Sequence, residues 1–363
     1  MGPSILEIDL KALAHNYRYI RSKIPAQTKL LGVVKANGYG SESVAIARKL
    51  AALGVDYLGV AYTHEGVLLR EQGIKTPILV LHPQPEEFNH IIEHGLEPSL
   101  YSNRTLQMFM KATEKECQYP IHLNINTGLN RLGFSVDDLG VVCEKILNHS
   151  TVKVKGIMSH LAATDDLSEK AYTDSQIEKF KEAVTSIEKK IGEMALKHLL
   201  NSSGILNFPE AAFNMVRSGI ALYGYGNHSK IDSLLKPVAT LTTKISQIHS
   251  IEKGSWVGYN KGFVAAKKMR IATLTIGHAD GISRIYGQGK GVVFLNGKPC
   301  PIIGNVCMDM LMIDLGNYGA KEGDSVVIFG KGASAETFAN GAKTISYELL
   351  TGIGVRVKRV IVD

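Results

Sequence analysis

Between residues 30 and 224, eight short apolar runs alternate with longer segments that carry one apolar face. The runs span 30–34, 57–61, 77–81, 96–102, 121–125, 154–158, 196–200 and 216–224. Helical spacing is visible in 43–54 and 174–196, where apolar residues recur every three to four positions. Eight strand–helix units in about two hundred residues predict an α/β fold with a parallel (β/α)8 TIM-type barrel. An open doubly wound sheet is the alternative.

The pattern changes after Ser229. Strand-like segments separated by Gly-containing turns follow, such as GVVFLNGKPCPIIG and DSVVIFG, and they indicate a mostly β part. A chain of 363 residues is long enough for two domains. We therefore predict a barrel over residues 1–228 and a β-rich C-terminal domain over 229–363.

Charge and hydropathy exclude several classes of protein. The 41 basic and 34 acidic residues give a net charge of +7 but form no long basic run, so we expect small anionic ligands and no nucleic acid. No stretch approaches the ~18 apolar residues of a membrane span, and the N-terminus lacks a signal-peptide layout. We expect a cytoplasmic protein without a membrane partner.

The cysteines and histidines predict no metal site. Cys117, Cys143, Cys300 and Cys307 show no short paired spacing, which fits a reducing compartment. His82, His90 and His94 are irregularly spaced. The chain also lacks the phosphate-loop, dinucleotide and His-Glu-x-x-His motifs.

Lys35 directly follows the first apolar run, in LLGVVKANGYG. At the carboxyl end of a barrel strand, partial desolvation would lower the pKa of this lysine and give an amine able to form a Schiff base. The alternative is an ordinary strand-end lysine whose ammonium group reaches water.

Polar residues also follow the fifth and sixth runs. Arg131 stands between Gly128 and Gly133, and its planar guanidinium suits a carboxylate or a phenolate oxygen. His160 ends the sixth run in GIMSHLA. A surface role for the arginine and a structural role for the histidine are the alternatives.

The last two runs end in residues suited to a phosphate. Ser202, Gly219 and Ile220 offer a hydroxyl and amides where barrels commonly bind phosphate. Arg217 is flanked by apolar residues, so we expect it to point inward, where an unpaired charge is costly. A lysine, a phosphate site and an inward arginine at one barrel mouth suit pyridoxal 5'-phosphate.

Six motifs, in chain order, resemble the alanine racemase family. They are VVKANGYG, NTGLNRLGF, GIMSHLA, NMVRSGIALYG, IGHADG and GNVCMDM. The resemblance implies a pyridoxal-phosphate barrel followed by a β domain, in which residues 1–10 alternatively join the β domain. It also implies a homodimer with shared active sites, a small amino-acid substrate, and conversion of L-alanine to D-alanine for peptidoglycan.

The resemblance also assigns roles to residues. Lys35 and Tyr259 of the partner subunit would be the two catalytic bases. The cofactor would be held by Lys35, Tyr39, His160, Ser202, Arg217, Gly219, Ile220 and Tyr347. Arg131 and Met308 would contact the substrate. His198 would lie behind Arg217 as its partner. The other residues next to the site or in its entryway would be Asn124, His278, Cys307 and Asp309.

Three positions depart from the family pattern. Asn124 stands where many members carry a modified lysine, Asn126 replaces an aspartate, and His278 replaces a tyrosine. The first two bear on the support of Arg131, and the third bears on substrate entry. Because Asn124 brings no negative charge to Arg131, we expect a bound chloride beside this pair or hydrogen bonds from its own amide.

Two other functions stay open at this stage. One is a related pyridoxal-phosphate enzyme on the same fold, such as a racemase of other or several amino acids, an aldolase or a decarboxylase. The other is a non-catalytic pyridoxal-phosphate-binding protein. Proteins of that kind consist of the barrel alone, so the β-rich part with Tyr259 and Met308 argues against it.

Overall fold

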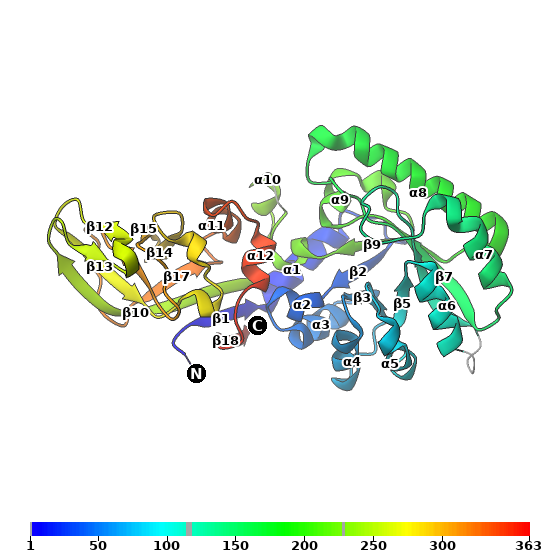
Figure 1. Ribbon diagram of the computed structural model, residues 1–363, viewed down its shortest axis with the longest axis horizontal. Coiled ribbons are helices and arrows are strands. Elements are labelled where there is room, and N and C mark those ends of the chain that lie inside the picture. Colours follow the sequence, from blue (N-terminus) through cyan, green and yellow to red (C-terminus); the bar gives the residue numbers. More distant parts are fainter. Residues whose placement is uncertain (1, 114–117, 227–228) are drawn as a thin grey trace.

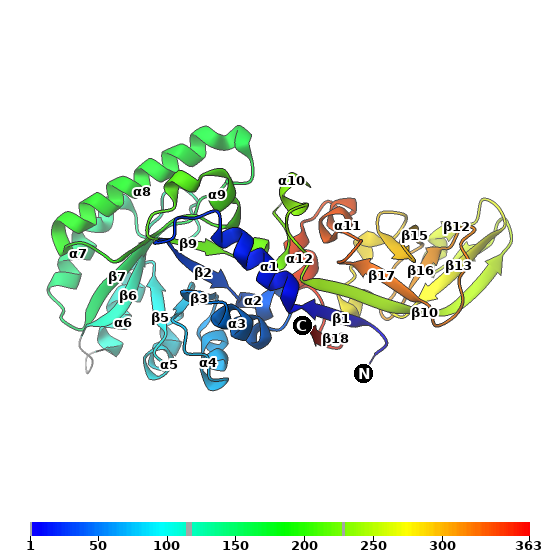
Figure 2. The same ribbon diagram turned by 180° about the vertical axis from the view of Figure 1, so that it is seen from behind.

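The computed structural model describes residues 2–113, 118–226 and 229–363, so Cys117 lies outside the described residues. Figures 1 and 2 show a barrel surrounded by helices at one end of the molecule and a sheet-rich part at the other. Both termini lie at the junction of the two parts.

Eight parallel strands form the predicted closed barrel. They are β2 (Lys29–Val33), β3 (Tyr57–Val60), β4 (Ile78–Val80), β5 (Glu97–Leu100), β6 (Tyr119–Asn124), β7 (Val152–Met158), β8 (Leu196–His198) and β9 (Met215–Ser218). Each lies within or overlaps one of the eight apolar runs. Pairing of β2 with β9 closes the barrel and excludes the open sheet.

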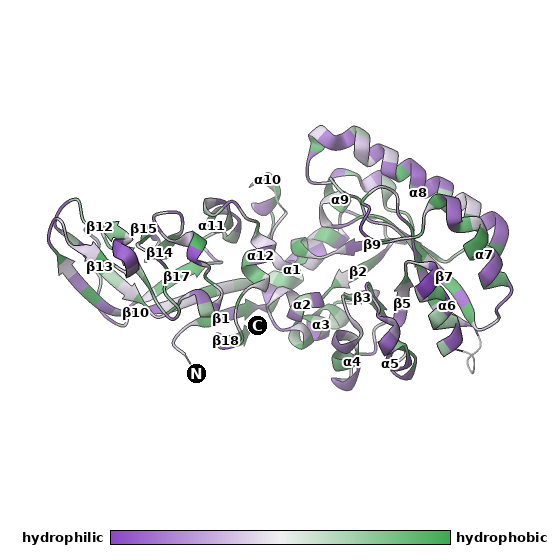
Figure 3. Ribbon diagram, viewed as in Figure 1, coloured by the Kyte–Doolittle hydropathy of each residue, from purple (hydrophilic) through white to green (hydrophobic). Residues whose placement is uncertain are grey.

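Helices cover the outside of the barrel. The longer ones are α1 (Leu10–Arg21), α3 (Ser43–Ala52), α4 (Thr63–Glu71), α5 (Phe88–Glu93), α6 (Asn103–Ala112), α7 (Leu139–Leu147), α8 (Lys170–Ile191) and α9 (Ser202–Asn207). On α8, Phe180 and Ile187 are buried, while hydrophilic residues follow the face seen in Figure 3. The predicted helix over 174–196 was wrong at its end, because Gly192 adopts a φ of 88° that stops the helix.

No described helix combines the length and the apolar character that crossing a membrane requires.

The other part is built on an eight-stranded sheet with the order β13-β16-β15-β14-β17-β10-β1-β18 among the described residues. Its strands are β1 (Ile5–Asp9), β10 (Ala239–Ile251), β13 (Met269–Leu274), β14 (Val292–Leu295), β15 (Lys298–Ile303), β16 (Leu311–Asp314), β17 (Ser325–Phe329) and β18 (Lys358–Val362). A small sheet of β11 (Trp256–Val257) and β12 (Phe263–Val264) and the helices α10 (Ser229–Asp232), α11 (Ala335–Gly341) and α12 (Ser346–Thr351) complete it.

Strand β1 connects the two parts of the molecule. It pairs antiparallel with β10 and parallel with β18, although the next residue, Leu10, begins helix α1 of the barrel. Residues 5–9 therefore lie in the sheet of the second part. The domain boundary at residues 228 and 229 stays a prediction.

Candidate active site

A cavity of about 680 Å³ lies at the carboxyl ends of the barrel strands. Ten residues singled out from the sequence line it together. They are Lys35, Tyr39, Asn124, Arg131, His160, Ser202, Arg217, Gly219, Ile220 and Tyr347. All of these except Tyr347, which lies on α12, lie in a barrel strand or follow one, so closure of the barrel brings them to one place.

Lys35 begins a short turn of unusual handedness, α2 (Lys35–Tyr39). Ala36, Asn37 and Gly38 have φ angles of 53°, 53° and 60°, in the left-handed region that L-residues rarely adopt. The carboxylate of Glu65 on α4 holds this turn, since it accepts from the Ala36 amide at 2.7 Å and from the Ala61 amide at 2.7 Å. Sequence reasoning did not single out Glu65.

Three effects lower the pKa of the Lys35 ammonium. Burial is the largest, and the positive charges of Arg131 and Arg217 add to it, while the carboxylate of Glu65 opposes them. A lowered pKa leaves more of the amine neutral near pH 7, and the neutral amine is the nucleophilic form.

Two tyrosines flank the turn. The ring of Tyr39 is buried and stacks on the ring of Tyr223, with the ring centroids 4.4 Å apart. The ring centroid of Tyr347 lies 6.0 Å from that of Tyr39. Burial raises the pKa of Tyr39, so its hydroxyl stays protonated and can donate a hydrogen bond. Its oxygen also occupies the space that a Cβ at Gly219 would need, which explains the glycine.

Ser202 and Gly219 are joined by a hydrogen bond of 2.9 Å from the Gly219 amide to Ser202 Oγ. The 3-10 turn Ile220–Tyr223 that follows begins without a side-chain cap. The Ala221 amide also donates to Ser202 Oγ, at 3.4 Å, so the Ile220 amide and the Ser202 hydroxyl are the groups that this corner can offer to a phosphate.

Arg217 is buried, and its guanidinium is held on several sides. Nη1 donates to His198 Nδ1 at 3.0 Å and to the His198 carbonyl at 2.8 Å. Nη2 donates to the Ser159 and Leu199 carbonyls at 2.6 and 3.1 Å and to His160 Nδ1 at 3.2 Å. Among the described residues no hydrogen bond uses Nε, which leaves that N–H for a group in the cavity.

Arg217 and its neighbour His160 differ in charge at neutral pH. Burial and the nearby Arg131 lower the pKa of Arg217 to about 10, so it remains a cation at neutral pH. Burial and the charges of Arg217, Arg131 and Lys35 lower the pKa of His160 to about 3. His160 is therefore neutral, and its Nδ1 can accept from Arg217.

Two polar residues behind His198 escaped the sequence reasoning. His122 Nδ1 lies 3.0 Å from His198 Nε2, and His122 Nε2 lies 2.9 Å from Glu97 Oε2. Both residues occur inside predicted strands, in IHLNI and LEPSLYS. Ionisable side chains inside apolar runs were the available signal.

Arg131 is exposed at the cavity rim and makes no hydrogen bond or ion pair with a residue that the structure describes. The Asn124 side chain, which is buried nearby, does not bond it either. Asn126 still orders the loop, because its Oδ1 accepts from the Gly128 and Asn130 amides at 3.1 Å each. The expected chloride beside Asn124 and Arg131 stays a prediction.

The remaining predicted residues do not reach this cavity in one chain. Tyr259 and Met308 lie in the sheet-rich part with 70% and 58% of their surfaces exposed. Asn305 Nδ2 donates to the Tyr259 carbonyl at 2.9 Å, and the His278 amide donates to the Cys307 carbonyl at 2.9 Å. The loops that carry these residues are thus neighbours on the second part.

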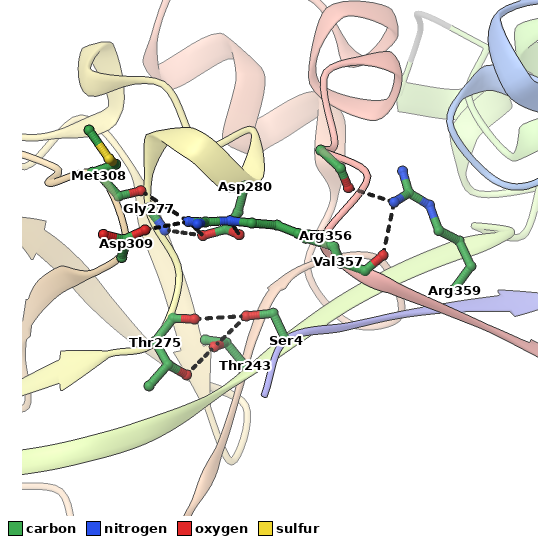
Figure 4. A network of polar contacts seen from close by, with 11 residues as sticks. Ser4, Thr243, Thr275, Gly277, Asp280, Met308, Asp309, Arg356, Val357 and Arg359 are labelled. Carbon is green, nitrogen blue, oxygen red and sulfur yellow. Dashed lines mark hydrogen bonds and ion pairs between the residues drawn. The ribbon is translucent and has the colours of Figure 1, made fainter. Parts of the chain in front are cut away.

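Arg356 fastens these loops, as Figure 4 shows. It bonds Asp280 at 2.6 Å and Asp309 at 2.7 Å. Ser4 and Thr243, in the same view, share a hydrogen bond of 2.9 Å that ties the chain before β1 to β10. Arg356 belongs to no motif that the sequence reasoning used.

A separate group of possible metal ligands lies on the surface. In the part of the chain that the structure describes, His90, Glu93 and His94 bring ligand atoms within 4.8 Å of one another at the end of α5. None of the three lines the cavity.

The barrel, the added sheet and a cationic cavity built around a lysine define a two-domain barrel enzyme. The comparisons identify its family. Residues 8–227 match the model of the alanine racemase N-terminal domain, and residues 238–361 match that of the C-terminal domain. The chain therefore belongs to the alanine racemase family, as the sequence motifs predict.

Relatives resemble the chain over its whole length. An alanine racemase of Thermodesulfovibrio yellowstonii is 36% identical, with 97% of this chain and 96% of the relative covered. The crystal structure of alanine racemase from D-cycloserine producing Streptomyces lavendulae matches with a TM-score of 0.95 at 31% identity, over 100% of this chain and 98% of that one. The enzyme of Bartonella henselae, solved with covalently bound pyridoxal phosphate, matches with a TM-score of 0.90 at 31% identity, over 100% of both chains.

Proposed function

We propose that this protein interconverts L-alanine and D-alanine with pyridoxal 5'-phosphate, by a two-base mechanism in a homodimer. The observation that carries the proposal is the cavity that joins Lys35, Arg217 and the Ser202–Gly219 corner. A homologous structure at 31% identity contains covalently bound pyridoxal phosphate. D-Alanine made in this way would supply peptidoglycan, and the cytoplasm stays the expected location.

The residues of the cavity fit the cofactor. Lys35 would hold it covalently, because its amine is partly buried and its pKa is lowered. Tyr39, Tyr347 and the uncapped turn at Ile220 would bind the phosphate. The unused Nε–H of Arg217 would face the pyridine nitrogen, with His160 neutral beside it.

Racemisation requires removal of the α-proton from one face and its return to the other. Pyridoxal phosphate, when bound, withdraws electrons from the α-carbon of an attached amino acid and so acidifies that proton. Lys35 would exchange the proton on one face, and Tyr259 of the partner subunit would exchange it on the other. Met308 of the partner subunit would lie near the substrate, while Arg131 would bind its carboxylate.

Arg217 has a further role in this proposal. Because the guanidinium stays protonated near neutral pH, it would donate a hydrogen bond to the pyridine nitrogen of the bound cofactor without transferring a proton to it. Arg217 would thereby limit the electron withdrawal that the cofactor supplies, and so disfavour side reactions such as transamination. The positive charge of Arg217 also contributes to the lowered pKa of Lys35.

The test is the variant Lys35→Ala. Loss of the amine should abolish covalent retention of the cofactor and reduce D-alanine formation by at least a thousandfold, since both roles of the residue disappear. Absorbance of the purified protein and chiral analysis of the product are the measurements. Serine and other amino acids, assayed alongside alanine, decide between an alanine racemase and one of broader range.

Lys29 provides the matched control. It is exposed at the opposite end of the same strand, β2, so Lys29→Ala should retain cofactor and turnover. Retention of both properties by Lys35→Ala would rule out the assigned role, and an inactive wild-type protein with bound cofactor would favour a non-catalytic binding protein.

A further inference from the structure

A line of hydrogen-bonded side chains crosses the barrel interior from the cavity to its opposite end. Arg217 Nη1 lies 3.0 Å from His198 Nδ1, His198 Nε2 lies 3.0 Å from His122 Nδ1, and His122 Nε2 lies 2.9 Å from Glu97 Oε2. We call these four residues the relay. Both histidines are fully buried, and Glu97 is the first residue of β5, at the end of the barrel away from the cavity.

The residues at the two ends of the relay determine the direction in which its hydrogen bonds are donated, from Arg217 towards Glu97. A carboxylate only accepts, so His122 must carry its proton on Nε2 and leave Nδ1 as an acceptor. His198 must then donate from Nε2, which leaves its Nδ1 to accept from Arg217. Arginine only donates, so both ends of the relay require the same Nε2–H tautomer in both histidines.

The charges agree with this direction. Burial, which has the largest effect, and the positive charge of Arg217 lower the pKa of His198 well below its ordinary value, which keeps it neutral. Burial alone would raise the pKa of Glu97, but the hydrogen bonds from His122 and Lys155 and the positive charge of Lys155 outweigh burial and lower it. Lys155 Nζ lies 2.6 Å from Glu97 Oε1, so each carboxylate oxygen has its own partner. The Tyr57 hydroxyl, 3.4 Å from Oε2, both donates and accepts and imposes no direction.

The backbone makes room for the relay. His122 on β6 pairs in register with Gly156 on β7. A Cβ at Gly156 would lie 2.5 Å from His122 Nδ1 and 2.8 Å from its Cε1, so the ring occupies space that only glycine leaves open. The position of His122 is therefore built into the barrel and does not depend on an exposed loop.

We propose that Glu97 is a positioning residue for the reaction at the other end of the barrel, because through His122 and His198 it fixes the acceptor that orients Arg217. This inference rests on the proposed function, in which the free Nε–H of Arg217 faces the cofactor ring. With Nη1 and Nη2 held by fixed acceptors, the guanidinium presents Nε to the cavity in one orientation.

The substitution Glu97→Gln should reverse the direction of hydrogen-bond donation between position 97, His122 and His198. The Lys155 ammonium requires an acceptor, so it selects the oxygen of the new amide, and the NH2 group then faces His122 Nε2. His122 must now carry its proton on Nδ1 and donate to His198, which places a proton on His198 Nδ1. Two donors, His198 Nδ1–H and Arg217 Nη1–H, then face each other across a contact of 3.0 Å in the wild type.

A second substitution should restore the original direction. In Glu97→Gln with Lys155→Met, no cation selects the amide oxygen, so the amide can turn its oxygen to His122 and its NH2 group to water at the half-exposed position 155. Lys155→Met alone should keep the wild-type tautomers, because Glu97 still accepts from His122. A merely structural role of Glu97 does not predict that the second change corrects the first.

The experiment combines ¹⁵N NMR of histidine-labelled full-length holoenzyme with racemase kinetics. In the wild type we expect Nε2–H on both His122 and His198, and in Glu97→Gln we expect Nδ1–H on both. The kcat of Glu97→Gln should fall roughly tenfold to a hundredfold, as when outer partners that fix histidine tautomers are lost. KM should change less, and the double variant should recover most of the loss.

Each outcome is decisive for one of the two claims. Unchanged tautomers and kcat in folded Glu97→Gln would overturn the relay. If that variant does not fold, the wild-type spectrum decides alone, since a proton on His198 Nδ1 contradicts the inference. Tautomers that switch in a protein without racemase turnover would support the relay and overturn the proposed function instead.

Discussion

At the scale of single residues, the cavity gathers positive charge around one amine. Arg131 and Arg217 both lower the pKa of Lys35, and burial lowers it further. The neutral state of His160 follows from the same surroundings. The site thus favours anionic groups such as phosphate and carboxylate, and it leaves a larger share of its lysine in the reactive, neutral form.

Replacement of Arg131 by methionine should move cofactor uptake to higher pH. The amine attacks only when it is unprotonated, and loss of the neighbouring cation raises the pKa of Lys35, so less neutral amine is present at pH 7. The measurement is the rate at which cofactor-free protein takes up pyridoxal phosphate, followed by absorbance across a pH series. Arg131→Lys keeps the charge and should keep the profile, whereas identical profiles for Arg131→Met and the wild type would contradict the stated cause.

At the scale of elements, the turn α2 depends on close contact with the C-terminal residues. Gly40 ends the turn with a φ of 79°, and a Cβ there would collide with the Leu350 carbonyl of α12. Arg359 Nε also donates to the Gly40 carbonyl at 3.2 Å. The same contact places Tyr347 of α12 beside Tyr39, so the geometry of the phosphate corner depends on two distant segments.

Gly40→Ala should therefore weaken both folding and cofactor binding. The positive φ costs an alanine about 1–2 kcal/mol, and the collision with α12 adds ~1–3 kcal/mol of overpacking. Gly54→Ala is the control, since Gly54 has a φ of 83° with no atom within 4 Å of a built Cβ. Denaturant unfolding and the Kd for pyridoxal phosphate measure the two effects. Equal losses in both variants would show that the contact with α12 contributes nothing.

At the scale of the whole molecule, one chain holds Lys35 and Tyr259 in separate places. Tyr259 is exposed on the second part, beside loops that carry Met308 and His278. Exposed apolar residues such as Trp256 and Met310 lie in the same part of the chain, and apolar surface of this kind is typical of interfaces. The proposed homodimer, in which each site takes residues from both subunits, would account for this separation.

Mixed dimers test that arrangement. Lys35→Ala and Tyr259→Phe subunits should each be inactive alone and recover about a quarter of wild-type activity after full exchange, because half of the dimers are mixed and each mixed dimer has one intact site. Mixing Lys35→Ala with Arg217→Ala should recover nothing, since both residues belong to the same chain's cavity. Recovery in neither mixture, despite demonstrated exchange, would indicate sites built from one chain.

The barrel could be predicted because its signals are local. Each apolar run and each helical spacing depends on residues a few positions apart. Lys35 and Ser202 follow two of those runs, and Arg217 and Gly219 lie within the last one. The end of α8 was misplaced, because an apolar pattern that continues past Gly192 does not reveal its positive φ. The family motifs named residues such as His198 but not the partners behind them.

The sequence by itself determined the number of barrel strands, the order of barrel and sheet, and the loops that carry the chemistry of the barrel, since these depend on neighbours along the chain. Only the tertiary structure decided that β1 lies between β10 and β18 and that His122 and His198, 76 residues apart, share a hydrogen bond. It also decided that Arg356 fastens the loops of the second part. These contacts depend on closure of the barrel and on packing between distant segments, which leave no periodic trace in the sequence.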